Sequence, residues 1–142
     1  MWSRFPGILA IGVACLVLSA CGGGGGHKTS PAPTSVTIVS GNGQSGTVGT
    51  ELPAALTVRI TDSGSRPVGG ATVSWAVTAG GGTVTPTVAT TDTGGTASTR
   101  WTLGATAGAN RATATVVGIP VVVFEATATA AVTASVTVTS PV

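Results

Sequence analysis

The sequence predicts an all-β fold, an antiparallel β-sandwich, on three observations. The 142-residue chain holds 26 threonines, which favour strands because they are β-branched, beside 22 glycines and 8 prolines, which mark turns. Apolar and polar residues alternate with a period of two in several short runs, as in strands with one buried face. Turn-forming clusters separate these runs, within the roughly one hundred residues typical of a sandwich.

The composition also excludes two classes of chain. Only 7% of the residues are charged and the formal net charge is +2, so no electrostatic footprint for nucleic acid is present. Hydrophobic residues make up 42% of the chain. Disordered segments combine low hydrophobicity with high charge, so this composition indicates a folded domain.

Residues 1–20 have the features of a secretory signal, which is excluded from the fold. Arg4 is followed by an uncharged, mostly apolar stretch of twelve residues, 7–18. This stretch is shorter than the ~20 residues that cross a bilayer as a helix. A basic start, an apolar middle and small residues at the end are typical of a signal peptide. Cys15 lies inside the apolar stretch and would be discarded with it.

The end of this segment, Leu18-Ser19-Ala20-Cys21, resembles the lipobox of bacterial lipoproteins. The resemblance implies that Leu18, Ser19 and Ala20 are recognised, that Cys21 receives a diacylglycerol, and that cleavage leaves Cys21 as the first mature residue. Gly22 stands where an aspartate would indicate retention in the inner membrane, so the resemblance favours the outer membrane. The alternative is an ordinary export signal with an incidental cysteine.

Residues 21–34 are predicted to be the lipidated cysteine and a flexible linker. Two acyl chains anchor a protein stably, so no basic patch is needed at the membrane. Glycines loosen the first part of the linker and Pro31 and Pro33 stiffen the second. Its thirteen residues after Cys21 span roughly 20 Å. His27 and Lys28 could contact a metal or a phosphate, but a solvated linker explains them.

The predicted sandwich occupies residues 35–130. In the run 56–61, Leu56, Val58 and Ile60 lie on one face and polar residues on the other. The expected strands are 36–38, 56–61, 72–78, 97–103, 112–116 and 124–128, and the expected turns are 62–67, 80–82, 92–95 and 104–108. No cysteine follows Cys21, so no disulfide can link these strands.

The predicted core consists of the apolar residues that are in phase on these runs. Three aromatic side chains, Trp75, Trp101 and Phe124, supply most of its bulk. Their aliphatic neighbours are Val58, Ile60, Val73, Val77 and Leu103. The alternative function for the tryptophans is a platform on which sugars stack. Their phase with aliphatic residues favours the core.

Residues 61–104 resemble bacterial immunoglobulin-like (Ig-like) domains of the invasin/intimin group, also called Big-1. The matching positions are Asp62, Pro67, Val68, Gly70, Ala71 and Val73, then Gly80 to Thr83, then Thr91, Asp92, Gly95 and Ala97. One departure is the glycine of the first turn, Gly64, which lies slightly earlier than in that pattern. The resemblance extends over about 35–130 and implies an immunoglobulin-like sandwich of the kind used in cell-surface spacers and adhesins.

Residues 131–142 are predicted to be a tail. The tail segment SVTVTS, 135–140, repeats the segment SVTIVS, 35–40, at four of six positions. The offset is about one module, so the tail would be the first strand of a second, truncated repeat. In a chain rich in valine, threonine and serine, chance is the alternative.

The ionisable residues do not predict an enzyme, a cofactor or a metal site. The one histidine lies in the linker, and the four acids are scattered along the domain. Catalysis by an acid and a base needs a positioned pair of such groups. Asp62 and Asp92 are expected to form turns by bonding to the backbone two residues on. Calcium is the alternative for them, but it needs six to eight oxygen ligands.

The sequence thus predicts an exported, monomeric Ig-like module, held to the cell envelope by the lipid on Cys21. We expect a structural, spacer or adhesive role, with an envelope protein, a host-surface protein or a glycan as partner and no nucleic acid. Periplasmic and surface display both remain open. The alternatives are a carbohydrate-binding module and the truncated remnant of a longer multi-repeat adhesin.

Overall fold

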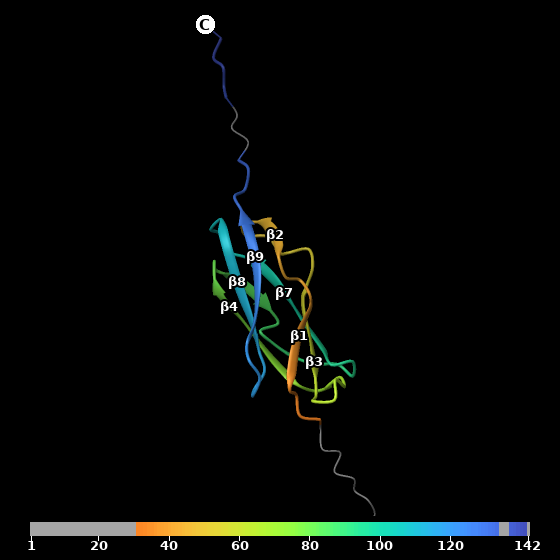
Figure 1. The fold of residues 1–142 in the computed structure, drawn as a ribbon. Helices are drawn as coiled ribbons and strands as arrows, with labels where there is room; N and C mark the ends of the chain where they lie inside the picture. Colours follow the sequence, from red (N-terminus) through yellow and green to blue (C-terminus); the bar gives the residue numbers. More distant parts are fainter. Residues whose placement is uncertain (1–30, 134–136, 142) are drawn as a thin grey trace, which may run out of the picture. The chain divides into compact units, whose positions relative to one another are not determined.

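The computed structural model describes residues 31–133 and 137–141, and in these residues it contains nine strands and no helix (Figure 1). The strands form two sheets. The first sheet has the order β1 (Ser35–Ser40), β3 (Leu56–Thr61), β7 (Thr96–Leu103) and β5 (Gly82–Thr85). The second has the order β2 (Gln44–Thr47), β9 (Val122–Thr129), β8 (Gly108–Thr115), β4 (Thr72–Ala79) and β6 (Val88–Thr90). The predicted all-β sandwich is confirmed.

One strand pair departs from the predicted antiparallel arrangement. β2 runs parallel to β9, with Gln44 opposite Ala126 and Thr47 opposite Thr129. The reason is that β1 and β2 follow one another in segment 35–47, which passes through a turn at 42–43 and keeps its direction while it changes sheet. Its first half pairs with β3 and its second half with β9. The second sheet is therefore mixed.

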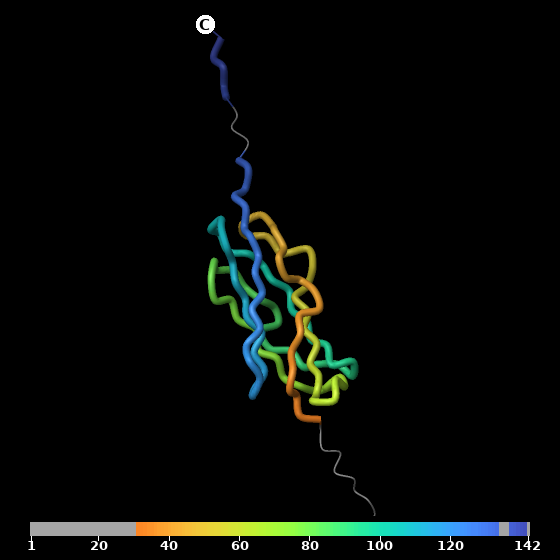
Figure 2. Tube along the Cα trace, in the orientation of Figure 1, coloured from red at the N-terminus to blue at the C-terminus, as the bar shows by residue number. Residues whose placement is uncertain are grey.

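The opposite edge of the sandwich has the same construction. Segment 82–90 pairs first with β7, as β5, and then with β4, as β6. The trace in Figure 2 follows both segments along the flanks of the domain. The first crossing passes close to its neighbours: at Gly41, with φ of 91°, a Cβ atom would lie 2.5 Å from the carbonyl oxygen of Ala55. Only glycine fits there without a shift of the backbone.

Three of the strands, β2, β5 and β6, are not among those predicted. They are three or four residues long, and β2 carries no apolar alternation. β5 begins at Gly82, inside the cluster 80–82 that the sequence marks as a turn. The turn itself is therefore shorter than predicted, and pairing with β7 extends the chain at Gly82.

The core lies between the two sheets. Trp101, on β7, and Phe124, on β9, are completely buried, and the rings of Trp75 and Phe124 pack at 5.8 Å with a tilt of 48°. The other buried apolar residues are Leu52, Leu56, Val58, Ile60, Val68, Val73, Val84, Ala97, Leu103, Ala112, Ala114, Val116, Ala126 and Ala128. Alanines predominate on β8 and β9, which leaves room for the large rings.

Two positions on the predicted inner faces are less buried than the pattern indicates. Val77 is only partly buried, because it lies on β4 beyond the part that β6 covers. Ile38 is exposed, because β1 is an edge strand and its ladder with β3 shifts register between Ile38 and Ser40. An edge strand has a neighbouring strand on one side only, so its side chains are less enclosed than those of a central strand.

Candidate functional site

The predicted lipidation site, Cys21 with the recognition residues Leu18, Ser19 and Ala20, lies outside the described residues, as do His27 and Lys28. The described chain begins at Pro31. The backbone N–H of Thr34 donates to the carbonyl oxygen of Thr61 at 2.9 Å, so the chain reaches the sandwich at the end where β3 finishes. No helix in the described part is long and apolar enough to cross a membrane.

At that end, the turn after β3 is built around the side chain of Asp62. Its Oδ1 atom accepts the backbone N–H of Gly64 at 2.8 Å and that of Arg66 at 2.9 Å. The carbonyl oxygen of Asp62 accepts the N–H of Ser65 at 3.0 Å. The carboxylate thus accepts hydrogen bonds from backbone N–H groups that find no backbone acceptor within a tight turn.

The turn before β7 repeats this arrangement around Asp92. Oδ1 of Asp92 accepts the N–H of Gly94 at 2.8 Å and that of Thr96 at 2.9 Å. The carbonyl oxygen of Asp92 accepts the N–H of Gly95 at 2.9 Å. In turn, the carbonyl oxygen of Gly95 accepts the N–H of Ile60 at 2.7 Å, which ties this turn to β3.

These contacts assign both aspartates a structural role. In each carboxylate one oxygen is occupied by two backbone N–H groups, and the described residues contain no group of three or more His, Cys, Asp or Glu side chains that could hold a metal ion. Calcium would need several further oxygen ligands. The arrangement accounts for both acids without a cation.

A buried threonine, Thr91, joins the two motifs, and the sequence analysis gave it no such role. Its Oγ1 atom donates to the carbonyl oxygen of Val68 at 2.6 Å and accepts the N–H of Ala71 at 2.9 Å. Two backbone bonds accompany it, from Gly70 N to Thr91 O at 2.8 Å and from Thr91 N to Ala71 O at 2.9 Å. The segment after Pro67 is thereby held against the start of the second turn. The one signal in the sequence is its place directly before Asp92.

The tryptophans are not available to a ligand. Trp101 is 0% exposed and Trp75 is 3% exposed. A sugar-stacking platform needs an accessible ring face, so the carbohydrate-binding alternative loses the residues on which it depended. Both indole N–H groups are buried without a hydrogen-bond partner in the described part of the chain.

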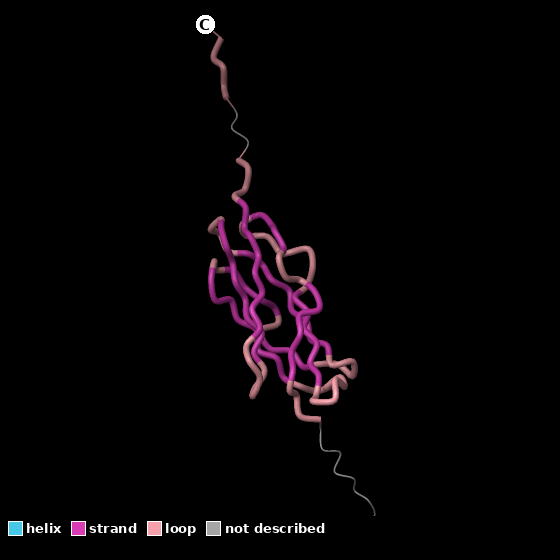
Figure 3. Tube along the Cα trace, viewed as in Figure 1, coloured by secondary structure: helices cyan, strands magenta, loops and turns pink. Residues whose placement is uncertain are grey.

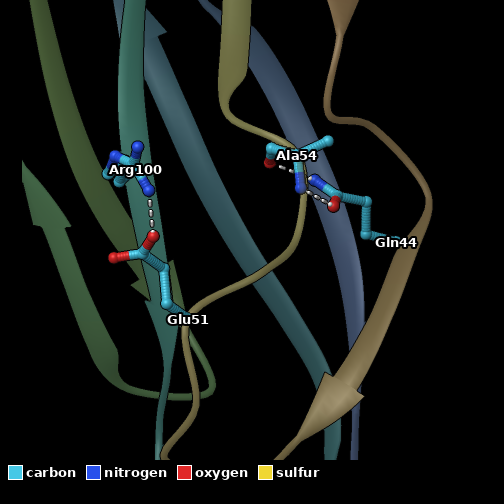
Figure 4. A network of polar contacts seen from close by, with 4 residues as sticks. All are labelled: Gln44, Glu51, Ala54 and Arg100. Atoms are coloured by element: carbon cyan, nitrogen blue, oxygen red, sulfur yellow. Dashed lines mark hydrogen bonds and ion pairs between the residues drawn. The ribbon is translucent and has the colours of Figure 1, made fainter.

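Four of the eight charged residues in the described part of the chain form two exposed ion pairs, on opposite sheets. Arg100 contacts Glu51 at 2.5 Å, and Arg111 contacts Glu125 at 3.0 Å. Figure 4 shows Arg100 reaching from β7 to Glu51. All four side chains are 45% exposed or more. Pairs of this kind contribute little to stability and are not arranged for acid–base chemistry.

Figure 4 also shows an amide contact that closes the flank of the sandwich. The side chain of Gln44 donates to Ala54 O at 2.8 Å and accepts Ala54 N–H at 2.9 Å, as a neighbouring strand would. It donates as well to Gly41 O at 2.8 Å. Gln44 therefore links the crossing between β1 and β2 to the segment that leads into β3.

Two shallow hollows are lined by described residues. One, of about 290 Å³, lies over β8 and β9 beside Arg111 and Glu125, and the other, of about 380 Å³, lies beside Val77, Val84 and the 3% exposed Trp75. The residues around the first are an ion pair and small side chains, and those around the second carry no ionisable group. Neither set contains an acid, a base and a nucleophile in reach of one another.

The outer face of the first sheet is rich in hydroxyl groups. One cross-strand row runs through Ser40, Thr57 and Ser98, and the next through Thr37, Arg59 and Thr96, since these residues are paired in register. Such a face can exchange hydrogen bonds with a partner. The exposed large apolar residues of this sheet are Ile38 and Val39, both on its edge strand β1.

No protein-family model matches the chain, and no curated protein does. Among solved structures, a C-terminal 282-residue fragment of intimin, in complex with the intimin-binding domain of the translocated intimin receptor, matches 68% of this chain and 32% of that one, with a TM-score of 0.51 and 21% identity. The Yersinia pseudotuberculosis adhesin InvE matches 69% of this chain and 32% of that one, with a TM-score of 0.55 and 17% identity.

The surface layer protein SbsC, in a structure of its domains 1–6, matches 72% of this chain and 14% of that one, with a TM-score of 0.50 and 16% identity. The matches span a third or less of each larger protein. At these identities they show the fold alone. The domain is an immunoglobulin-like β-sandwich of the type found in intimin and in the adhesin InvE.

Proposed function

We propose that this protein is a lipid-anchored module of the bacterial cell envelope that serves as a spacer or adhesive domain through contact with another protein. The observation that carries the proposal is the combination of a lipobox, Leu18 to Cys21, with an Ig-like domain of the intimin and InvE type. Intimin was solved bound to a protein receptor, which supports a protein as the class of partner. The outer membrane is the proposed location, because no aspartate follows Cys21.

A binding or spacer role also agrees with the surfaces of the domain. The carboxylates of the two turn aspartates bind backbone N–H groups of their own turns. Both tryptophans are buried, and the two ion pairs are exposed. Nothing in these groups supplies a nucleophile with its base. The hydroxyl-rich face of the first sheet suits contact with a macromolecule.

The anchor is tested by substitution of the two cysteines in the full-length chain. Cys21→Ala is expected to abolish incorporation of labelled fatty acid and to move the protein from the membrane fraction to the soluble fraction. Cys15→Ala is the matched control, because it removes a thiol from the discarded segment and leaves the lipobox intact. Unchanged fractionation and electrophoretic mobility of Cys21→Ala would refute the anchor.

The partner is tested with the mature lipidated protein in vesicles, screened against envelope proteins, host-surface proteins and a glycan array. We expect saturable binding to a protein. Binding to glycans alone would instead support the carbohydrate-binding alternative, through a surface other than Trp75 and Trp101.

The truncated-remnant alternative is favoured by one observation, the repetition of segment 35–40 at 135–140. Residues 137–140 are described and form no strand, whereas residues 134–136 lie outside the described part. Sequencing of the DNA downstream of the coding region distinguishes the alternatives. A continuation of the pattern found at 36–130 would support the remnant.

A further inference from the structure

The loop between β8 and β9, residues 116–121, is apolar on its exposed side. Val117 is 92% exposed, Val121 is 51% exposed, and Val123, just beyond on β9, is 44% exposed. We call these three residues the apolar tip. No charged residue occurs from 112 to 124, and the pair Arg111–Glu125 lies outside that stretch. Single exposed valines are ordinary, but three around one uncharged loop indicate a surface that is covered in use.

The loop is held in place by the core, so the exposure of the tip is a property of the fold. Val116 is 4% exposed and Ile119 packs partly buried against the core. The N–H of Ile119 donates to the carbonyl oxygen of Val116 at 3.1 Å, which closes the loop. These two residues face inward while Val117 and Val121 remain outside.

The apolar tip lies at the end of the sandwich where the chain arrives from its N-terminal side. β1 and β2 share one direction and β2 is parallel to β9, so the start of β9 and the start of β1 lie at the same end. Figure 3 shows the loop and the arriving chain at that end, with the C-terminal tail leaving from the other. In the loops of the opposite end, 48–55, 80–81 and 104–107, none of the exposed large apolar side chains occurs, and the one exposed valine described next to them, Val132 at 98%, belongs to the tail that leaves there.

We propose that the apolar tip rests on the lipid surface and forms a second membrane contact beside the lipid of Cys21. This inference rests on the proposed anchor. The linker after Cys21 holds thirteen residues and spans roughly 20 Å, so the tip is confined within reach of the headgroups. A tether of this length makes the second contact intramolecular, and a contact that is weak in free solution then suffices. Valine side chains and an uncharged loop suit the interfacial region.

Charged groups at the same end set the orientation. Asp62, Arg66 and Asp92 lie on the turns next to β3 and β7, in the first sheet, whereas the apolar tip belongs to the second sheet. Charged groups remain in water while the tip enters the interface. The domain therefore leans toward the side of the second sheet, and the hydroxyl-rich face of the first sheet is turned outward.

The test places one reporter thiol at each end of the mature, lipidated protein, in which the thiol of Cys21 is already alkylated. Val117→Cys and the matched control Thr106→Cys, in an exposed loop of the opposite end, are labelled with an environment-sensitive fluorophore. Both proteins are reconstituted in vesicles of phosphatidylethanolamine and phosphatidylglycerol. The label at 117 is expected to shift to shorter emission wavelength and to lose intensity when nitroxide lipids are included, while the label at 106 changes in neither respect.

A second variant, Val121→Asp in the Val117→Cys background, is expected to abolish the wavelength shift without loss of vesicle attachment. Circular dichroism controls for folding, which an exposed position should leave unchanged. Vesicle attachment through Cys21 with a solvent-like label at 117 would overturn the second contact and leave the anchor intact. Failure of the lipidated protein to remain with vesicles would overturn both. A label that is shielded in whole cells but solvent-like in pure lipid would show that a protein covers the tip, which also overturns the inference.

Discussion

Ser65 and Gly95 occupy the same position in two matching turns. Each is the third residue after an aspartate whose Oδ1 accepts two backbone N–H groups, and the φ angles are 62° and 73°. This left-handed conformation is easy for glycine and costs an L-residue with a side chain roughly 1–2 kcal/mol. The domain thus contains the same turn once in a relaxed form and once in a strained form.

The first prediction relaxes the strained turn. Ser65→Gly is expected to raise the free energy of unfolding by about 0.5–1 kcal/mol, because relief of the left-handed strain exceeds the added freedom of the unfolded chain. Urea denaturation followed by tryptophan fluorescence measures the change. Ser63→Gly, in the same turn but without a positive φ, is the control and should lower stability. A loss of stability in Ser65→Gly would contradict the argument.

The second prediction concerns the glycine of the matching turn. In Gly95→Ala the new Cβ atom would lie 2.5 Å from Ile60 O and 2.9 Å from Val68 N, so the backbone of two neighbours must move. We expect a loss of about 3–5 kcal/mol, as for other substitutions that force a steric clash in a packed site. Gly70→Ala is the control, since Gly70 has a φ of 78° but nothing within 4 Å of the added atom. If both substitutions lowered the free energy of unfolding equally, the positive φ angle and not the steric clash would account for the loss.

The third prediction tests the buried hydroxyl of Thr91. Thr91→Val keeps the shape of the side chain but leaves Val68 O and Ala71 N without their hydrogen-bond partner. The free energy of unfolding should fall by about 2–4 kcal/mol, because buried groups that lose a partner carry their full desolvation penalty. Thr90→Val, at the exposed neighbouring position, should change stability by less than about 0.5 kcal/mol. Equal values for the two variants would argue against the proposed role.

The fourth prediction concerns Trp101, whose indole N–H is buried and has no hydrogen-bond partner among the described residues. Trp101→Ala should cost about 3–5 kcal/mol through the cavity that it creates. Trp101→Phe should cost clearly less, about 1 kcal/mol, because removal of the unpaired N–H offsets part of the lost volume. Thermal and urea unfolding of both variants give the comparison. A penalty for Trp101→Phe as large as that for Trp101→Ala would mean that the N–H is satisfied in solution.

The longer strands could be predicted because their side chains carry the alternation that one buried face imposes. β3, with Leu56, Val58 and Ile60, is an example. β2, with the sequence QSGT, has no such signal, because its position follows from the crossing at Gly41 and from pairing with β9. β5 and β6 likewise form because they pair with β7 and β4, and this pairing depends on the tertiary structure.

The surface could be predicted less well than the core. The apolar run around Val117 and Val121 reads like a buried segment, and only the structure shows that both side chains are exposed. The turn aspartates carried their own local signal, since an aspartate followed by glycine two residues on is a turn pattern. For Thr91 the only signal was its place directly before Asp92, because its partners lie 20 and 23 residues away along the chain.

The parallel pairing of β2 with β9 has a mechanical consequence. The chain arrives at one end of the sandwich before β1 and leaves at the other after β9 (Figure 1). A force that pulls these two points apart slides β2 along β9, so the hydrogen bonds from Gln44 to Thr47 are loaded together and not opened one by one. A domain tethered at one end and engaged by a partner toward the other would then resist extension as a unit.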